Sequence, residues 1–170
     1  MLKSSVFILF IFFTIQSCQL QSKSYMAEKP VDVILQLPSK EKIRTKIVFT
    51  DEDQSRGLSG IASSQFAPDQ AMLFFYFHDN YRSFWMPDTY FDLDIFFVDK
   101  DLVIIDVQRN VPHHPGRNEP PSIARTRSVK CRHVLELRAD SVFAKKLKIG
   151  DKLNWKSSPY PEQIKPKTHL

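Results

Sequence analysis

Hydrophobic and polar residues alternate along much of the chain, and this alternation begins at residue 31. In the segment 42–49, KIRTKIVF, the isoleucines, the threonine and the phenylalanine fall on one side, whereas the lysines and the arginine fall on the other. A period of two is typical of β-strands. The same reasoning predicts strands in 31–37 and 132–137.

Two other segments, 71–77 and 93–99, are almost continuously apolar. Such runs are typical of strands that are covered on both faces. The polar triplet Asp-Lys-Asp at 99–101 separates the second run from another apolar segment, 102–107, and this arrangement predicts a β-hairpin. A last short strand is expected in 152–155.

Two short helices interrupt the strands. Thr50 has the side chain of an N-cap and is followed by three acidic residues, 51–53, which favour the positive end of a helix, while Gly57 can end that helix. A second helix is expected after Asp140 or Ser141, followed by a turn at Gly150. The sequence therefore predicts an α+β fold, mostly antiparallel, with a small curled sheet or a barrel-like β domain and two short helices.

The N-terminal segment indicates export. Lys3 is the only charged residue before an apolar run that extends from Val6 to Phe13. Because a membrane span needs about 20 apolar residues, this run is too short and is typical of a secretory signal. We interpret residues 1–17 as a signal peptide.

Ile15, Gln16, Ser17 and Cys18 resemble the bacterial lipobox, in which the cysteine thiol receives a lipid and becomes the new N-terminus. This resemblance implies lipidation of Cys18, a lipid-anchored tether over 18–30 and attachment to the membrane. An ordinary cleavage site with Cys18 incidental is the alternative.

Residues 31–156 are expected to form a single globular domain, and the proline-rich 157–170 a flexible tail. Cys131 would then be the one cysteine without lipid. A single thiol cannot close an internal disulfide, so we expect a buried free thiol there, on the same strand face as His133, Leu135 and Leu137. A disulfide between Cys18 and Cys131 in an unlipidated form is the alternative.

The charge pattern limits the class of partner. The chain carries 24 basic and 19 acidic residues, a formal net charge of +5, and the basic residues are dispersed rather than clustered. This pattern does not indicate nucleic-acid binding. At most it supports weak attraction to an anionic membrane surface.

Six motifs occur in an order and spacing that resemble the family catalogued as domain of unknown function 192. They are QSRGLSG (54–60), AMLFFYF (71–77), FWMPDT (84–89), LDIFFVD (93–99), HVLEL (133–137) and KIGDKL (148–153). The resemblance covers about residues 31–155 and implies a compact strand-rich fold without an established activity. The chain departs from the family pattern at Ser59, Ala71, Asp88 and Asp92, and the last two departures add carboxylates.

Three aspartates and one arginine are candidate catalytic or ligand-binding residues. Asp92 and Asp94 are two residues apart and would share a face of a strand, and Asp88 lies just before it, so the three could bind a cation or act as an acid. Hydrogen bonding in turns and loops is the alternative, and we favour a structural role for Asp94. Arg56 could bind an anionic ligand, although a buried or half-buried ion pair with a carboxylate such as Asp94 or Glu136 is the preferred interpretation.

The consecutive apolar residues Phe84, Trp85 and Met86 must bury some large side chains and can present another to a ligand. His113 and His114 are adjacent in a proline-bounded loop, but no third ligand has metal spacing, so neither a metal nor a cofactor is expected. His133 is expected to be a hydrogen-bonding residue of a strand.

Two functional classes remain open. The favoured one is a non-catalytic lipoprotein module of the cell envelope that binds a small ligand or a partner protein. Its candidate ligand-binding residues are Arg56, Trp85, Met86, Asp88 and Asp92, with structural roles for Asp94, Gly57 and Gly150. The alternative is an envelope hydrolase that uses the carboxylate cluster.

Overall fold

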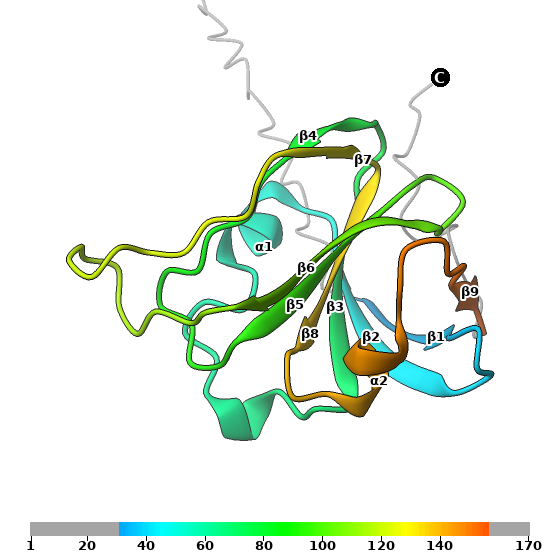
Figure 1. Cartoon of the computed structure of the whole chain (residues 1–170), viewed down its shortest axis with the longest axis horizontal. Helices are drawn as coiled ribbons and strands as arrows, with labels where there is room; N and C mark the ends of the chain where they lie inside the picture. Colours follow the sequence, from blue (N-terminus) through cyan, green and yellow to red (C-terminus); the bar gives the residue numbers. More distant parts are fainter. Residues whose placement is uncertain (1–30, 157–170) are drawn as a thin grey trace, which may run out of the picture.

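The computed structural model describes residues 31–156 (Figure 1). The predicted signal peptide, the tether with Cys18 and the tail over 157–170 lie outside the described residues. Within the described range, no helix is long and apolar enough to cross a membrane.

The described chain is mostly strand. Its elements are β1 (Val31–Gln36), β2 (Lys42–Val48), α1 (Asp51–Arg56), the 3₁₀-helix η1 (Ser63–Gln65), β3 (Gln70–Phe74), β4 (Asn80–Arg82), β5 (Leu93–Val98), β6 (Ile104–Val111), β7 (Val129–Cys131), β8 (His133–Arg138), α2 (Val142–Lys146) and β9 (Asn154–Trp155).

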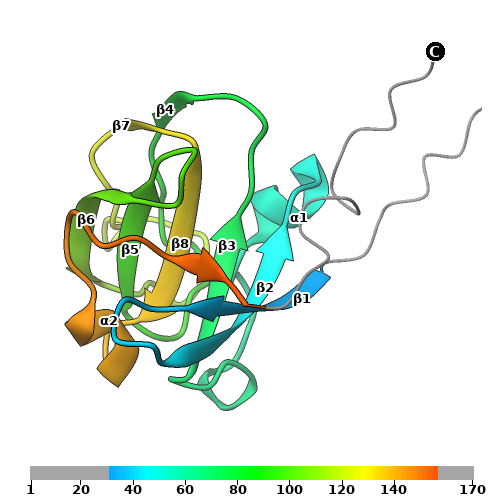
Figure 2. The same ribbon diagram turned by 90° about the vertical axis from the view of Figure 1, so that its right-hand side faces the viewer.

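Seven strands form one mixed sheet in the order β6-β5-β8-β3-β2-β1-β9, and β4 pairs with β7 in a separate ribbon. Among the strands within residues 31–156, only β2 and β3 pair in parallel, and the chain between them contains α1 and η1. The sheet curls into a half-barrel, and the segment leading to β9 runs across its hollow side (Figures 1 and 2). An isolated bridge between Val103 and Lys152 connects this segment to the start of β6.

Apolar side chains fill both faces of the sheet, as expected for strands that are covered twice. All six residues of β5 are buried. The first core contains aliphatic residues of β1 and β2 together with Ala144 and Leu147 from the α2 region. The second core lies on the other face and contains Leu58, Phe74, Met86, Ile95 and Val134.

The predicted strand-rich, mostly antiparallel fold with a curled sheet and two short helices is confirmed. The helix ends also follow the prediction. Thr50 Oγ1 accepts a hydrogen bond from the Asp53 amide at 3.1 Å, and Gly57 ends α1 with φ +51°. Of the two predicted caps of α2, Ser141 is the one that accepts hydrogen bonds from the helix amides.

Two features differ from the prediction. The short strands β4 and β7 were not expected, because three-residue strands carry too little periodicity to be recognised. The chain also bends at Arg132 between β7 and β8. As a result, the free thiol of Cys131 is buried in the second core, whereas Leu135 and Leu137 face the first core.

Candidate functional site

A cavity of about 400 Å³ opens on the face of the sheet that carries the second core. Its wall is formed by α1 and the turn after it, by the end of β3, by residues 81–87 and Thr89, and by single residues of β5, β8 and the loop after β6. The polar and aromatic side chains of the wall are Gln54, Ser55, Arg56, Ser59, Phe74, Tyr76, Tyr81, Arg82, Ser83, Phe84, Trp85, Thr89, Arg117 and Glu136.

Glu136 of β8 lines this cavity from within the sheet, between β5 and β3. Its backbone pairs with Met72 of β3 and with Ile95 of β5, so apolar side chains flank it on both sides. The residue is only 4% exposed, and within residues 31–156 no hydrogen bond or ion pair of its carboxyl group is found. Burial alone raises the pKa of Glu136 to about 8. At neutral pH this side chain is therefore mainly a neutral acid that can donate a hydrogen bond.

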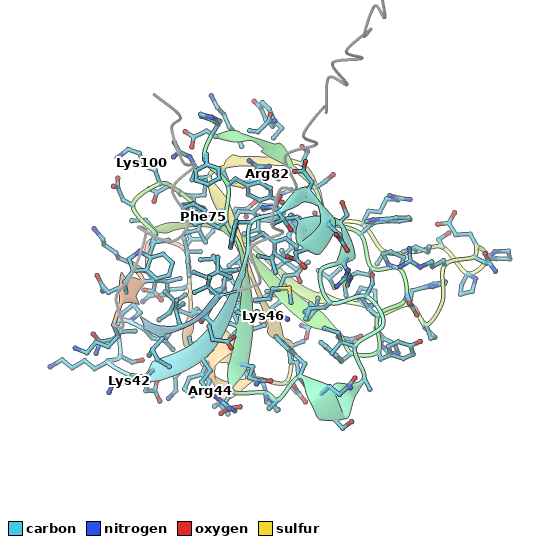
Figure 3. All side chains as sticks on the ribbon, turned by 180° about the vertical axis from the view of Figure 1, so that it is seen from behind. Lys42, Arg44, Lys46, Phe75, Arg82 and Lys100 are labelled. Carbon is cyan, nitrogen blue, oxygen red and sulfur yellow. The ribbon has the colours of Figure 1, made fainter. Side chains whose placement is uncertain are left out.

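Arg82 and Tyr76 form a stacked pair beside the cavity. The guanidinium carbon of Arg82 lies 3.2 Å from the centre of the Tyr76 ring, and Nη2 donates to the His78 carbonyl at 2.9 Å. Burial raises the pKa of Tyr76 to about 12; the Arg82 charge opposes this shift and the nearby Glu136 adds to it. Figure 3 shows Arg82 close to α1, on the side of the molecule seen from behind. The stacking and the hydrogen bond hold the positively charged Arg82 guanidinium at the wall of the cavity.

Trp85 provides an aromatic surface at the edge of the cavity. Its side chain is 47% exposed, and the Arg125 guanidinium lies 4.5 Å from the centre of its ring. The neighbouring Phe84 packs edge-on against Phe74, with ring centres 4.8 Å apart, and Met86 is buried. The three consecutive residues thus divide their roles: Phe84 and Met86 pack toward the second core, and Trp85 is available to a ligand.

The structure brings four of the residues singled out from the sequence to this cavity, namely Arg56, Gly57, Trp85 and Met86. Gly57 allows a close approach, because a Cβ atom there would lie 3.0 Å from Cζ of Phe74. Gly150 lies elsewhere, in the turn before β9, where it adopts φ +92°.

The three aspartates that the sequence suggested as a cluster have separate partners. Asp88 accepts a hydrogen bond from the Tyr90 hydroxyl at 2.8 Å, and Asp92 lies 2.6 Å from Nδ1 of His113. Hydrogen bonds from His113 lower the pKa of Asp92. Asp94 is buried and binds Arg109. The expected sharing of a strand face by Asp92 and Asp94 is wrong, because β5 begins only at Leu93 and Asp92 is exposed.

The preferred interpretation of Arg56 is also wrong. Its side chain is 58% exposed and pairs with Glu52 of the same helix at 2.7 Å, rather than with Asp94 or Glu136. This is the ordinary ion pair between residues four apart on a helix. Arg56 therefore lines the cavity without holding α1 to the sheet.

The histidines have ordinary surroundings. His114 is buried, with ring nitrogens 3.2 Å from the Gly116 carbonyl and 3.0 Å from the Pro121 carbonyl. His133 accepts a hydrogen bond from the Tyr76 amide, and burial lowers its pKa to about 3. Across residues 31–156 no group of three acidic, histidine or cysteine side chains could hold a metal ion.

Sequence reasoning missed the buried acid of the site. Glu136 was considered only as a partner for Arg56, although one acidic residue inside the apolar strand HVLEL is an available signal. The stacking of Arg82 on Tyr76 left no comparable signal, because it depends on the position of β4.

Comparison with known proteins agrees with the sequence motifs. The profile of the DUF192 family, described as uncharacterized ACR, matches residues 33–155. No curated protein shows significant similarity to the chain.

Two solved structures share the fold. One is described as a candidate transcription regulator from Sinorhizobium meliloti 1021; it has 26% identity and a TM-score of 0.59, over 75% of this chain and 95% of the other. The second is a protein of unknown function from Novosphingobium aromaticivorans DSM 12444, with 23% identity and a TM-score of 0.58, over 74% of this chain and 85% of the other. The family match covers most of the chain, so this protein belongs to the DUF192 family of uncharacterized proteins.

Proposed function

We propose that this protein is an exported lipoprotein of the cell envelope whose β domain is a non-catalytic binding module for a small ligand. Lipidation of Cys18 would anchor it, and the cavity beside Trp85 would hold the ligand. The proposal of an anchor is supported by the short apolar segment that ends at Cys18.

The observation that carries the binding role is Glu136. A buried carboxyl group without a partner costs free energy, and such groups are rare in proteins unless they serve a purpose. Here the group faces a cavity with an exposed tryptophan at its edge. A ligand that supplied the missing hydrogen bond would recover part of this cost.

A binding role is favoured over hydrolysis because the carboxylates proposed for the hydrolase are each bound to a different partner. General acid and base catalysis needs groups that converge on one reacting bond. Glu136 has no second carboxylate beside it in the wall of the cavity.

The binding role can be tested by thermal unfolding of the full chain in the presence of neutral sugars, amino acids, carboxylates and phosphates. At least one class is expected to raise Tm in the wild type and not in Trp85→Ala. Tyr90→Ala is the matched control, because Tyr90 is 45% exposed but does not line the cavity. Equal shifts in wild type and Trp85→Ala, or no shift with any class, would contradict the proposal.

The anchor requires a separate measurement. Metabolic labelling with a radioactive fatty acid is expected to label the wild type and not Cys18→Ser, and fractionation should place the wild type with membranes. Label that remains on Cys18→Ser would disprove lipidation at that residue.

A further inference from the structure

We infer that the ligand of this cavity is a small molecule with an oxyanion, a carboxylate or a phosphate, that contacts Arg82 and Arg117 and accepts a hydrogen bond from Glu136. A flat or apolar part of the same molecule lies against Trp85. This inference rests on the proposed binding role of the cavity and adds the chemical class of the ligand.

The charges of the wall support an anion. Glu136 is its only acidic residue, whereas three arginines line it. The charged and titratable side chains of the wall are Arg56, Tyr76, Tyr81, Arg82, Arg117 and Glu136. Arg56 is paired with Glu52, but Arg82 and Arg117 against one buried acid still leave the wall positive whether or not Glu136 is ionised.

Arg117 is the cation best placed to meet a ligand. Its side chain is exposed, and among the described residues it has no ion-pair partner, in contrast to Arg56. The loop that carries it is held at the cavity by a hydrogen bond of 2.5 Å from the Asp88 amide to the Gly116 carbonyl. Guanidinium groups bind carboxylates and phosphates through paired hydrogen bonds.

Binding of an oxyanion also depends on whether the Glu136 carboxyl group is protonated. In its neutral form the carboxyl group can donate to an oxyanion, and in its ionised form it repels one. Burial keeps the pKa of Glu136 near 8, so the donor form predominates at pH 7. The flanking Met72 and Ile95 side chains offer no competing polar group.

Four compounds that share a phenyl ring can separate charge from aromatic contact: benzoate, phenyl phosphate, benzamide and benzylamine. The chain has two tryptophans, so Trp155→Phe in the full chain leaves the Trp85 indole as the single indole signal in a ¹H–¹⁵N spectrum. Benzoate or phenyl phosphate at millimolar concentration is expected to move this signal, with an affinity at least about tenfold higher than that of the neutral and cationic compounds. The two anions distinguish a carboxylate from a phosphate ligand.

Two variants test the residues. Arg117→Gln is expected to weaken binding of the anion by roughly tenfold, while Arg44→Gln, on β2 away from the cavity, should leave it unchanged (Figure 3). If only the neutral form of Glu136 binds, affinity should fall by about tenfold between pH 7 and pH 9. Glu136→Gln, which remains neutral, should bind with little change over that range.

The results that would overturn the inference differ from those that would overturn the binding role. If benzamide or benzylamine moves the Trp85 signal as readily as benzoate, the cavity binds ligands but does not select anions. An Arg117→Gln variant with unchanged affinity for benzoate would also contradict the inference. If none of the four compounds moves the signal, the anion class is wrong, and the thermal unfolding experiment decides separately whether the cavity binds another class.

Discussion

Two buried carboxyl groups lie on the neighbouring strands β5 and β8 but on opposite faces of the sheet. Asp94 is paired in register with Leu137 and shares its face with the first core, whereas Glu136 is paired with Ile95 and shares its face with the second core. Their surroundings differ in kind. Asp94 is surrounded by partners, and Glu136 has a cavity in front of it.

The partners of Asp94 come from a bulge in the pairing of β5 with β6. There Asp94 faces two residues, and it binds Arg109 Nη1 at 2.6 Å and the Asn110 amide at 2.9 Å. Arg109 also donates to the carbonyls of Ala144 and Leu147, so the pair connects the sheet to α2. With these bonds, Asp94 has a structural role. Glu136 is equally buried but has none of them, so its carboxyl group is available to a ligand.

The largest loss of stability at pH 7 is expected when the Asp94 charge is removed. Asp94→Asn should lower the free energy of unfolding at pH 7 by about 3 kcal/mol, because it leaves Arg109 partly buried beside a neutral group. Glu136→Gln is the matched variant on the other face, and it should not destabilise the protein. Urea denaturation monitored by circular dichroism measures both. Equal losses in the two variants would remove the distinction between the two sites.

A second prediction uses the pH dependence of stability. The pKa of Glu136 rises from 4.5 in the unfolded chain to about 8 in the fold, so the folded state holds the proton more tightly. This contribution to stability is fully present below pH 4.5 and is lost as the pH rises through about 8, with a slope of up to about 1.4 kcal/mol per pH unit.

Glu136→Gln lacks this titration. Its free energy of unfolding, measured relative to that of the wild type by urea denaturation at several pH values, should therefore increase from pH 5 to pH 8 and then remain level. A constant difference between the two proteins over this range would show that Glu136 is not held neutral by burial.

The same contrast explains how much the sequence could predict. Alternation and continuous apolar runs located strands of the main sheet, and local capping chemistry located both helices, because these signals lie within a few residues. The pairing of β4 with β7 depends on residues about 50 positions apart and left no local pattern. The partner of Asp92, His113, likewise comes from a distant loop.

For the candidate site, the sequence indicated Arg56, Trp85 and Met86, since they lie in recognisable motifs. It could not show that Asp94 has partners and Glu136 has none, because both are single acids in apolar strands. The error with Arg56 was avoidable. Glu52 stands four residues before it, and that spacing is a local signal for an ion pair.

A third prediction concerns the glycine that shapes the cavity. Gly57 combines φ +51° with ψ −128° and lies against Phe74, so Gly57→Ala should lower the free energy of unfolding by about 2 kcal/mol. Gly150→Ala has the conformational cost without the contact, because nothing lies within 4 Å of the added methyl group, and should lose about 1 kcal/mol. Urea denaturation of both variants provides the measurement. A larger loss for Gly150→Ala would show that contact with Phe74 is not the deciding factor.

The smallest effect on stability is expected for substitution of Arg56. This arginine lines the cavity of Glu136, and it can be compared with Arg109, which binds Asp94. Arg56 is mostly exposed and paired with an exposed Glu52, so Arg56→Gln should change the free energy of unfolding by less than about 0.5 kcal/mol. Arg109→Gln should instead be strongly destabilising, because it leaves the buried Asp94 without its ion pair. If urea denaturation gave similar losses for both, Arg56 would be part of the scaffold, and the positive wall of the cavity would need no ligand to explain it.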